Sequence, residues 1–184
     1  MPAKFFSNSD STSDGTERVE RERLLAEQLR TELKDRAVVL DHRTVPGTNC
    51  HIDHIVIAPS GVWVIDANES DGRVERRDLG GWRSVDERLY VGGKDRTNLV
   101  DGIDRQVIAV ENVLIQQKLD VPVHAALCFV NSEWGWFAKP FSLSGVWVTW
   151  GQKLAELVLD WEAMPSTQID RVARVVDSNL PSKV

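Results

Sequence analysis

Several common signals are missing from this sequence of 184 residues. No apolar run approaches the roughly 18 residues that a membrane-spanning helix needs, so we expect no membrane partner. Residues 1–15 are rich in Ser and Asp, and they lack the apolar stretch and the cleavage site of a secretory signal peptide. Only two cysteines are present, Cys50 and Cys128, and we interpret both as reduced, structural thiols. These absences favour a cytoplasmic location.

The histidines and the net charge give no signal for two further classes of protein. The four histidines form neither an HxxxH nor an HExxH pattern, so a transition-metal site built on them is not expected. The net charge of −6 is not the basic balance that marks many nucleic-acid-binding proteins. A carboxylate cluster that holds a divalent metal would also add negative charge. Basic residues gather between Arg73 and Arg105, and we interpret them as an ordinary solvated surface.

The length and the order of the predicted elements indicate one domain. A chain of 184 residues can bury one sizeable core, and hydrophobic residues make up an ordinary 42% of it. We predict a flexible tail at 1–15, a single domain at 16–184, helices at 16–34, 99–117, 152–160 and 166–178, and strands at 37–40, 51–58, 62–67, 73–77, 88–91, 121–130 and 145–150. This order predicts an α/β or α+β fold with a central mixed sheet flanked by helices.

The first predicted helix carries a carboxylate on its apolar side. Glu22 lies on the stripe that is formed by Val19, Ala26, Leu29 and Leu33 at helical spacing. A carboxylate that faces a core is costly unless it is paired, protonated or bound to a metal. Two interpretations stay open: Glu22 is a functional acid, or it lies at the edge of the stripe and reaches solvent.

Two more acids lie inside neighbouring apolar strands that are joined by a tight turn at 59–61. Asp53 and Asp66 on adjacent strands would suit Mg²⁺ or Mn²⁺, which prefer hard oxygen ligands. A two-residue loop puts Asp53 directly opposite Asp66, whereas a turn with a glycine bulge puts His54 beside Asp66. The sequence is compatible with both registers.

Several short segments match a known pattern when they are taken together. They are residues 20–27, 52–56, 59–67, 89–93, 104–106, 127–130 and 145–148. The most specific part is Ile-Asp-His-Ile followed by Gly-Val-Trp-Val-Ile-Asp-Ala. Over roughly residues 17 to 160 the chain resembles the nuclease-related domain (NERD) family, which is related to the PD-(D/E)XK nucleases. The resemblance implies a restriction-endonuclease-like fold.

The resemblance also implies a site. Glu22 would help to bind a metal, Asp53 would be the central ligand, and Asp66 would be the second acid. The carbonyl oxygen of Ala67 would be a further ligand, and Gln106 would lie near the site. The implied cofactor is Mg²⁺ or Mn²⁺, and the implied partner is DNA, whose phosphodiester bonds water would attack.

One position departs from the family pattern. The pattern has a lysine two residues after Asp66, and this sequence has Asn68 there. Residues two apart in a strand share a face, so Asn68 points the same way as Asp66 and can hydrogen-bond a water, but it supplies no cation. Arg73 and Lys94 are candidates for that charge.

Three functions stay open. The first is a metal-dependent DNA phosphodiesterase whose activity is weakened by the missing lysine. The second is a catalytically inactive nuclease-fold domain that binds DNA or a protein partner. In the third, Asp53 and Asp66 are purely structural acids, held by the backbone or by His51 and His54. The apolar setting of Asp53 and Asp66 and the family resemblance favour a present or former metal site.

The seven tryptophans predict mostly core or rim positions. Trp134 and Trp136 lie in a loop-like stretch, and of the seven we expect these two to be partly exposed. Exposed tryptophans can serve as stacking platforms for nucleic-acid bases, although core packing is their commoner use.

Overall fold

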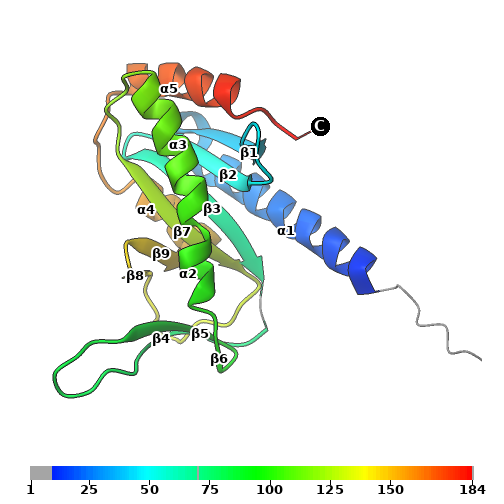
Figure 1. Ribbon diagram of the computed structural model, residues 1–184, viewed down its shortest axis with the longest axis vertical. Coiled ribbons are helices and arrows are strands. Elements are labelled where there is room, and N and C mark those ends of the chain that lie inside the picture. The colour runs from blue at the N-terminus through cyan, green and yellow to red at the C-terminus, as the bar shows by residue number, and fades with distance from the viewer. Residues whose placement is uncertain (1–9, 70, 184) are drawn as a thin grey trace, which may run out of the picture.

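A computed structural model describes residues 10–69 and 71–183. Its main element is a six-stranded sheet with the strand order β1-β2-β3-β7-β9-β8 (Figure 1). The strands are β1 (Val38–Thr44), β2 (His51–Ala58), β3 (Gly61–Glu69), β7 (Val123–Val130), β8 (Phe141–Leu143) and β9 (Val146–Thr149). β1, β2 and β3 pair antiparallel, β3, β7 and β9 pair parallel, and β8 pairs antiparallel with β9. The predicted α/β fold with a central mixed sheet is therefore confirmed.

Helices cover both faces of this sheet (Figure 1). α1 (Asp10–Leu33) and α4 (Gly151–Val158) pack on one face, and α3 (Asp104–Gln116) and α5 (Ser166–Asn179) pack on the other. A short 3-10 helix η1 (Lys34–Arg36) follows α1, and α2 (Asn98–Gly102) precedes α3. Among the described residues, no helix combines the length and the apolar character that crossing a membrane requires.

The alternation of side chains along β3 divides the hydrophobic core into two layers. Val62 and Val64 pack toward α3 and α5, whereas Trp63 and Ile65 pack toward α1 and α4, and none of these side chains is accessible to solvent. The central strands are therefore buried on both faces, which explains why they are nearly continuous apolar runs in the sequence. A charged residue in such a strand is exceptional and needs a partner.

A second, three-stranded sheet lies beyond one end of the large sheet (Figure 1). It contains β4 (Val74–Asp78), β5 (Glu87–Val91) and β6 (Lys94–Asp95). Leu89 and Val91 bury their side chains in the core that α3 and α5 share with the large sheet. The small sheet thus shares a hydrophobic core with the large sheet.

Some predicted boundaries differ from the structure. α1 begins at Asp10, so residues 10–15 are helical, and residues 1–9 of the predicted tail lie outside the described residues. Val19 is 59% exposed, so the apolar stripe of α1 begins later in the helix than predicted. The predicted helix at 99–117 is interrupted at Ile103, between α2 and α3. β6 and β8 have two and three residues, too few for a recognisable periodicity.

Candidate active site

The turn between β2 and β3 decides which residues of the two strands face each other. Ala58 pairs with Gly61, and the same antiparallel register continues along the hairpin. This is the register of the two-residue loop, and its continuation brings Asp53 opposite Asp66. The alternative with a glycine bulge, which would put His54 beside Asp66, is wrong.

Packing around the turn explains this register. Gly61 has a φ of +134°, and a Cβ atom at this position would lie 2.5 Å from the carbonyl oxygen of Pro122, so no larger residue fits there. The Ser60 hydroxyl donates a hydrogen bond of 2.6 Å to the carbonyl of Val158, and the Trp63 indole donates one of 2.8 Å to Ser60. The turn is thereby fixed against α4 and against the entry into β7.

Asp53 is almost fully buried and uses both carboxylate oxygens. Its Oδ2 accepts a hydrogen bond of 3.0 Å from the backbone N–H of Ala67 on β3. Its Oδ1 accepts one of 2.8 Å from the Arg18 guanidinium on α1. Asp53 therefore links the hairpin to the first helix, and its side chain is only 4% exposed.

Glu22 is the second buried carboxylate at this point. Its Oε1 lies 2.6 Å from Nε of Arg18, and its Oε2 lies 3.0 Å from Nδ1 of His42 on β1. Glu22 is 5% exposed, so the alternative in which it lies at the edge of the stripe and reaches solvent is wrong. One guanidinium is thus shared by two buried carboxylates, and its hydrogen bond to Glu22 raises the pKa of Arg18 further above its ordinary value.

Asp66 lies beside this pair and is affected by it. Burial, together with the negative charge of Asp53, raises the pKa of Asp66 to about 6. Asn68 donates a hydrogen bond of 3.0 Å from its amide to Oδ2 of Asp66, which partly offsets the rise. Asp66 and Asn68 therefore share a face, as predicted, and Asn68 contacts Asp66 as a neutral donor.

A cleft of about 440 Å³ opens above Glu22 and Asp53. Residues of α1, β1 and β2 line it together with Lys183, which comes from the C-terminal segment. This segment runs along the edge strand β1: the N–H of Lys183 donates to the carbonyl of His42 at 2.7 Å, and the N–H of Thr44 donates to the carbonyl of Pro181 at 2.9 Å. The backbone pairing brings Lys183 to the cleft, and no local sequence signal predicts it.

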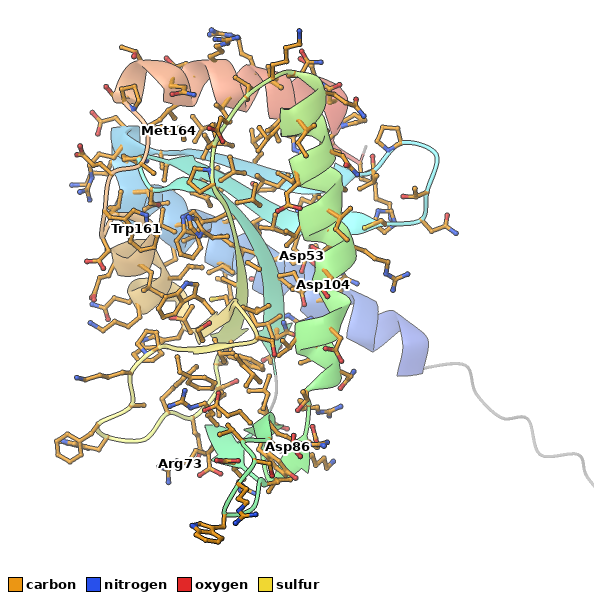
Figure 2. The ribbon with its side chains drawn as sticks, turned by 60° about the vertical axis from the view of Figure 1, so that its left-hand side comes forward. Asp53, Arg73, Asp86, Asp104, Trp161 and Met164 are labelled. Carbon is orange, nitrogen blue, oxygen red and sulfur yellow. The ribbon has the colours of Figure 1, made fainter. Side chains whose placement is uncertain are left out.

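Gln106 lies beside the cleft, whereas Arg73 and Lys94, the candidates for the missing positive charge, do not line it. Gln106 on α3 lines a neighbouring depression of about 540 Å³, which meets the cleft at His51. Its Oε1 is buried, and no hydrogen-bond partner for it exists among the described residues. Arg73, directly before β4, is well separated from Asp53 (Figure 2), and neither Arg73 nor Lys94 lines the cleft.

The donor atoms suit a hard divalent cation, but an arginine already supplies positive charge. Carboxylate oxygens of Glu22, Asp53 and Asp66 are the kind that Mg²⁺ and Mn²⁺ prefer. The raised pKa of Asp66, caused by its burial and by the charge of Asp53, is of the kind that a bound cation relieves. Within residues 10–69 and 71–183, however, no three His, Cys, Asp or Glu side chains are arranged as a metal-binding group. The cation between Glu22 and Asp53 is Arg18.

The mixed sheet and its two helical layers define a protein of the α/β class. Residues 18–130 match the family of the nuclease-related domain, NERD, over more than half of the chain. The chain therefore belongs to the NERD family. No curated protein and no solved structure matches it. The matched part includes Glu22, Asp53 and Asp66, whereas α4, α5 and Lys183 lie beyond it.

Proposed function

We propose that this NERD domain is a divalent-metal-dependent phosphodiesterase that acts on DNA. The observation that carries the proposal is the facing pair Asp53 and Asp66, with Glu22 joined to Asp53 through Arg18. Glu22 from α1 and Asp53 from β2 line one cleft, with Asp66 on β3 beside Asp53, and buried acids such as Glu22 and Asp53 are costly unless they are paired or bind a metal. Membership of a nuclease-related family supports the same function.

In this proposal, Asp53, Asp66 and the carbonyl oxygen of Ala67 would hold Mg²⁺ or Mn²⁺, with Glu22 binding directly or through water. The ion would supply Lewis acidity toward a phosphodiester and lower the pKa of a neighbouring water. Arg18 would leave Asp53 when the ion binds, because one cation replaces another. The Arg18 side chain is 54% exposed, so it is free to turn outward and bind a phosphate oxygen.

The charge that the family pattern assigns to a lysine needs another source. Asn68 orients Asp66 through its hydrogen bond, but it is neutral. Lys183 lines the same cleft as Glu22 and Asp53, and its ammonium group carries a full positive charge. We therefore propose that Lys183 stabilises the negative charge that develops on the phosphate.

The test is cleavage of supercoiled and single-stranded DNA by the purified chain with Mg²⁺ or Mn²⁺. We expect Asp53→Ala to lower the rate on the order of 100-fold or more and Lys183→Ala to lower it about tenfold. Asn68→Lys should raise the rate, because it restores a cation beside Asp66. Lys153→Ala is the matched control, since Lys153 on α4 pairs with Glu156 at the surface and does not line the cleft.

The outcomes separate the parts of the proposal. Cleavage that survives in Asp53→Ala would reject the site. Cleavage that is unchanged in Lys183→Ala would reject only the part given to Lys183. Cleavage by Asn68→Lys alone would mean that the metal site is retained and the natural chain is inactive.

A second function is favoured by the contact of Arg18 with both acids. If Arg18 is the permanent partner of Glu22 and Asp53, the chain is a catalytically inactive nuclease-fold domain that binds DNA or a protein. Calorimetric titration with Mn²⁺ distinguishes the two functions. The phosphodiesterase requires Mn²⁺ binding that Asp53→Ala abolishes, and the inactive domain predicts no binding at this site.

A further inference from the structure

A groove separate from the cleft lies between the small sheet and the segment after β7. It has a volume of about 810 Å³ and is lined by residues 73–77 and 134–141. Figure 2 shows side chains projecting from both of these segments, with Arg73 directly before β4. None of the residues that line the cleft beside Asp53 lines this groove.

The two walls of the groove are joined by backbone hydrogen bonds. The N–H of Val74 donates to the carbonyl of Glu133 at 2.9 Å, and the N–H of Glu133 donates to the carbonyl of Gly72 at 3.1 Å. A Cβ atom at Gly135 would lie 2.7 Å from the Arg73 guanidinium, so this arginine packs directly against the opposite wall. The width of the groove is therefore set by the fold.

The lining is basic, although the chain carries a net charge of −6. Arg73, Arg76, Arg77 and Lys139 line the groove, against the single carboxylate of Glu75. Glu75 is shared by Arg73 at 3.4 Å and Arg77 at 2.6 Å. These side chains are partly or largely exposed, and such surface pairs are weak enough to exchange for phosphate oxygens.

The opposite wall presents aromatic rings to solvent. Trp136 is 94% exposed and Phe137 is 90% exposed, and the two are consecutive in the chain. Trp134, in the same wall, is held by ring contact with Trp150 at 4.5 Å between centroids. Adjacent exposed rings beside basic side chains are the combination that binds unpaired nucleic-acid strands, because bases stack on the rings while cations contact the phosphates.

We propose that this groove binds an unpaired strand of nucleic acid, with bases on Trp136 and Phe137 and phosphates on Arg76, Arg77 and Lys139. A duplex keeps its bases stacked on each other and offers no free base face to these rings. An acidic peptide would satisfy the cations but has no base faces for the exposed rings. The inference goes beyond the proposed function, because binding here requires neither a metal nor the acids of the cleft.

The test is fluorescence anisotropy of a labelled oligodeoxythymidylate of roughly 20 nucleotides. The full chain is used in EDTA, so that cleavage cannot contribute. We expect the double substitution Trp136→Ala, Phe137→Ala to weaken binding at least about tenfold, because each stacked base contributes several-fold. Trp82→Ala is the matched control: Trp82 is 93% exposed but does not line the groove, so affinity should stay within about twofold.

The contribution of the basic side chains is measured separately, by the salt dependence of the affinity. Arg76→Gln combined with Lys139→Gln should reduce the slope of log affinity against log salt by roughly 1.4, because two phosphate contacts are lost. Arg171→Gln combined with Arg174→Gln on α5 should leave the slope unchanged, since both arginines are exposed and lie outside the groove.

Three results would overturn the proposal. The first is equal affinity of the ring variant and the natural chain for the oligonucleotide. The second is an affinity for a DNA duplex of the same length that equals the affinity for the single strand. The third is binding of polyglutamate without binding of the oligonucleotide, which would assign the groove to an acidic protein partner. Because all of these are measured in EDTA, none depends on whether the chain cleaves DNA.

Discussion

Two regions of this protein share charges in opposite ways. At the cleft, one arginine, Arg18, is shared by two carboxylates whose side chains are 6% and 4% exposed. On the small sheet, one carboxylate, Glu75, is shared by two arginines and is 29% exposed. The first arrangement leaves an excess of buried negative charge, and Asp66 adds to it. The second leaves an excess of positive charge at the surface.

The difference shows how burial gives similar ion pairs different roles. Buried carboxylates cannot rely on water, so losing Arg18 demands another cation. Exposed arginines keep most of their hydration, so their partner is exchanged at little cost. The cleft is therefore suited to cations and the groove to anions. Three substitutions test this contrast, from the largest expected effect to the smallest.

The largest effect is expected for Asp66 in metal-free buffer. Its pKa is raised to about 6, so its contribution to stability is present below the unfolded pKa and is lost as the pH rises through about 6. Between about pH 4 and pH 6 the unfolding free energy of the natural chain should fall by about 2 to 3 kcal/mol relative to that of Asp66→Asn. Urea unfolding in EDTA at a series of pH values measures this difference.

Asp41 provides the control for that experiment. Burial alone would raise the pKa of Asp41, but its hydrogen bonds with His54 and Arg30 outweigh burial and lower it. The contribution of Asp41 to stability is therefore present above its unfolded pKa and is lost as the pH falls. Relative to Asp41→Asn, the natural chain should thus lose unfolding free energy as the pH falls, whereas relative to Asp66→Asn it loses it as the pH rises. Parallel profiles for the natural chain and Asp66→Asn would contradict the buried-acid account.

The next effect concerns the shared guanidinium. Arg18→Ala leaves Glu22 and Asp53 buried without this partner, and we expect a loss of about 2 kcal/mol in unfolding free energy. This value is below that of a fully buried pair because half of the Arg18 side chain is exposed. Mn²⁺ should restore more stability to Arg18→Ala than it adds to the natural chain. Chemical denaturation with and without Mn²⁺ gives both values.

Arg23→Ala is the matched control on the same helix. Arg23 also pairs with two glutamates, Glu20 and Glu27, but all three side chains are at least half exposed. The loss of unfolding free energy in Arg23→Ala should be clearly smaller than in Arg18→Ala and should not respond to Mn²⁺. Equal losses in the two variants would mean that the burial of Glu22 and Asp53 has no energetic consequence.

The smallest effect on stability is expected on the small sheet. Glu75→Gln removes the shared partner of Arg73 and Arg77, and it should change the unfolding free energy much less than Arg18→Ala does. The same substitution should tighten oligonucleotide binding about threefold, since it removes the one negative charge that lines the groove. Thermal unfolding and anisotropy, measured on the same preparation, compare the two effects. Weaker binding in Glu75→Gln would mean that Glu75 organises the arginines for the ligand.

The acids of the site could be predicted from the sequence because each one interrupts a regular apolar pattern. Asp53 and Asp66 stand out in buried strands, and Glu22 stands out on a helical stripe. The same hydrophobic patterns predicted most strands and helices. The segments that resemble the NERD family predicted how these elements are arranged in the fold. The burial of Trp63 and the exposure of Trp136 agree with the expected division between core and loop tryptophans.

Other features depended on contacts between distant parts of the chain. The hairpin register was decided by the fit of Gly61 against Pro122, which lies beyond α3 in the sequence. The Arg18 bridge required α1 to pack beside β2, and the packing of α3 placed Gln106 in a depression that meets the cleft at His51.

The sequence by itself determined the class of fold, the family and the candidate acids, because hydrophobic periodicity and local motifs are properties of neighbouring residues. Only the tertiary structure decided that Arg18 provides the cation between two of those acids, that Lys183 reaches the cleft, and that residues 73–77 and 134–141 form one groove. The physical reason is that side-chain charges act through space, and the sheet brings together residues that the chain keeps far apart.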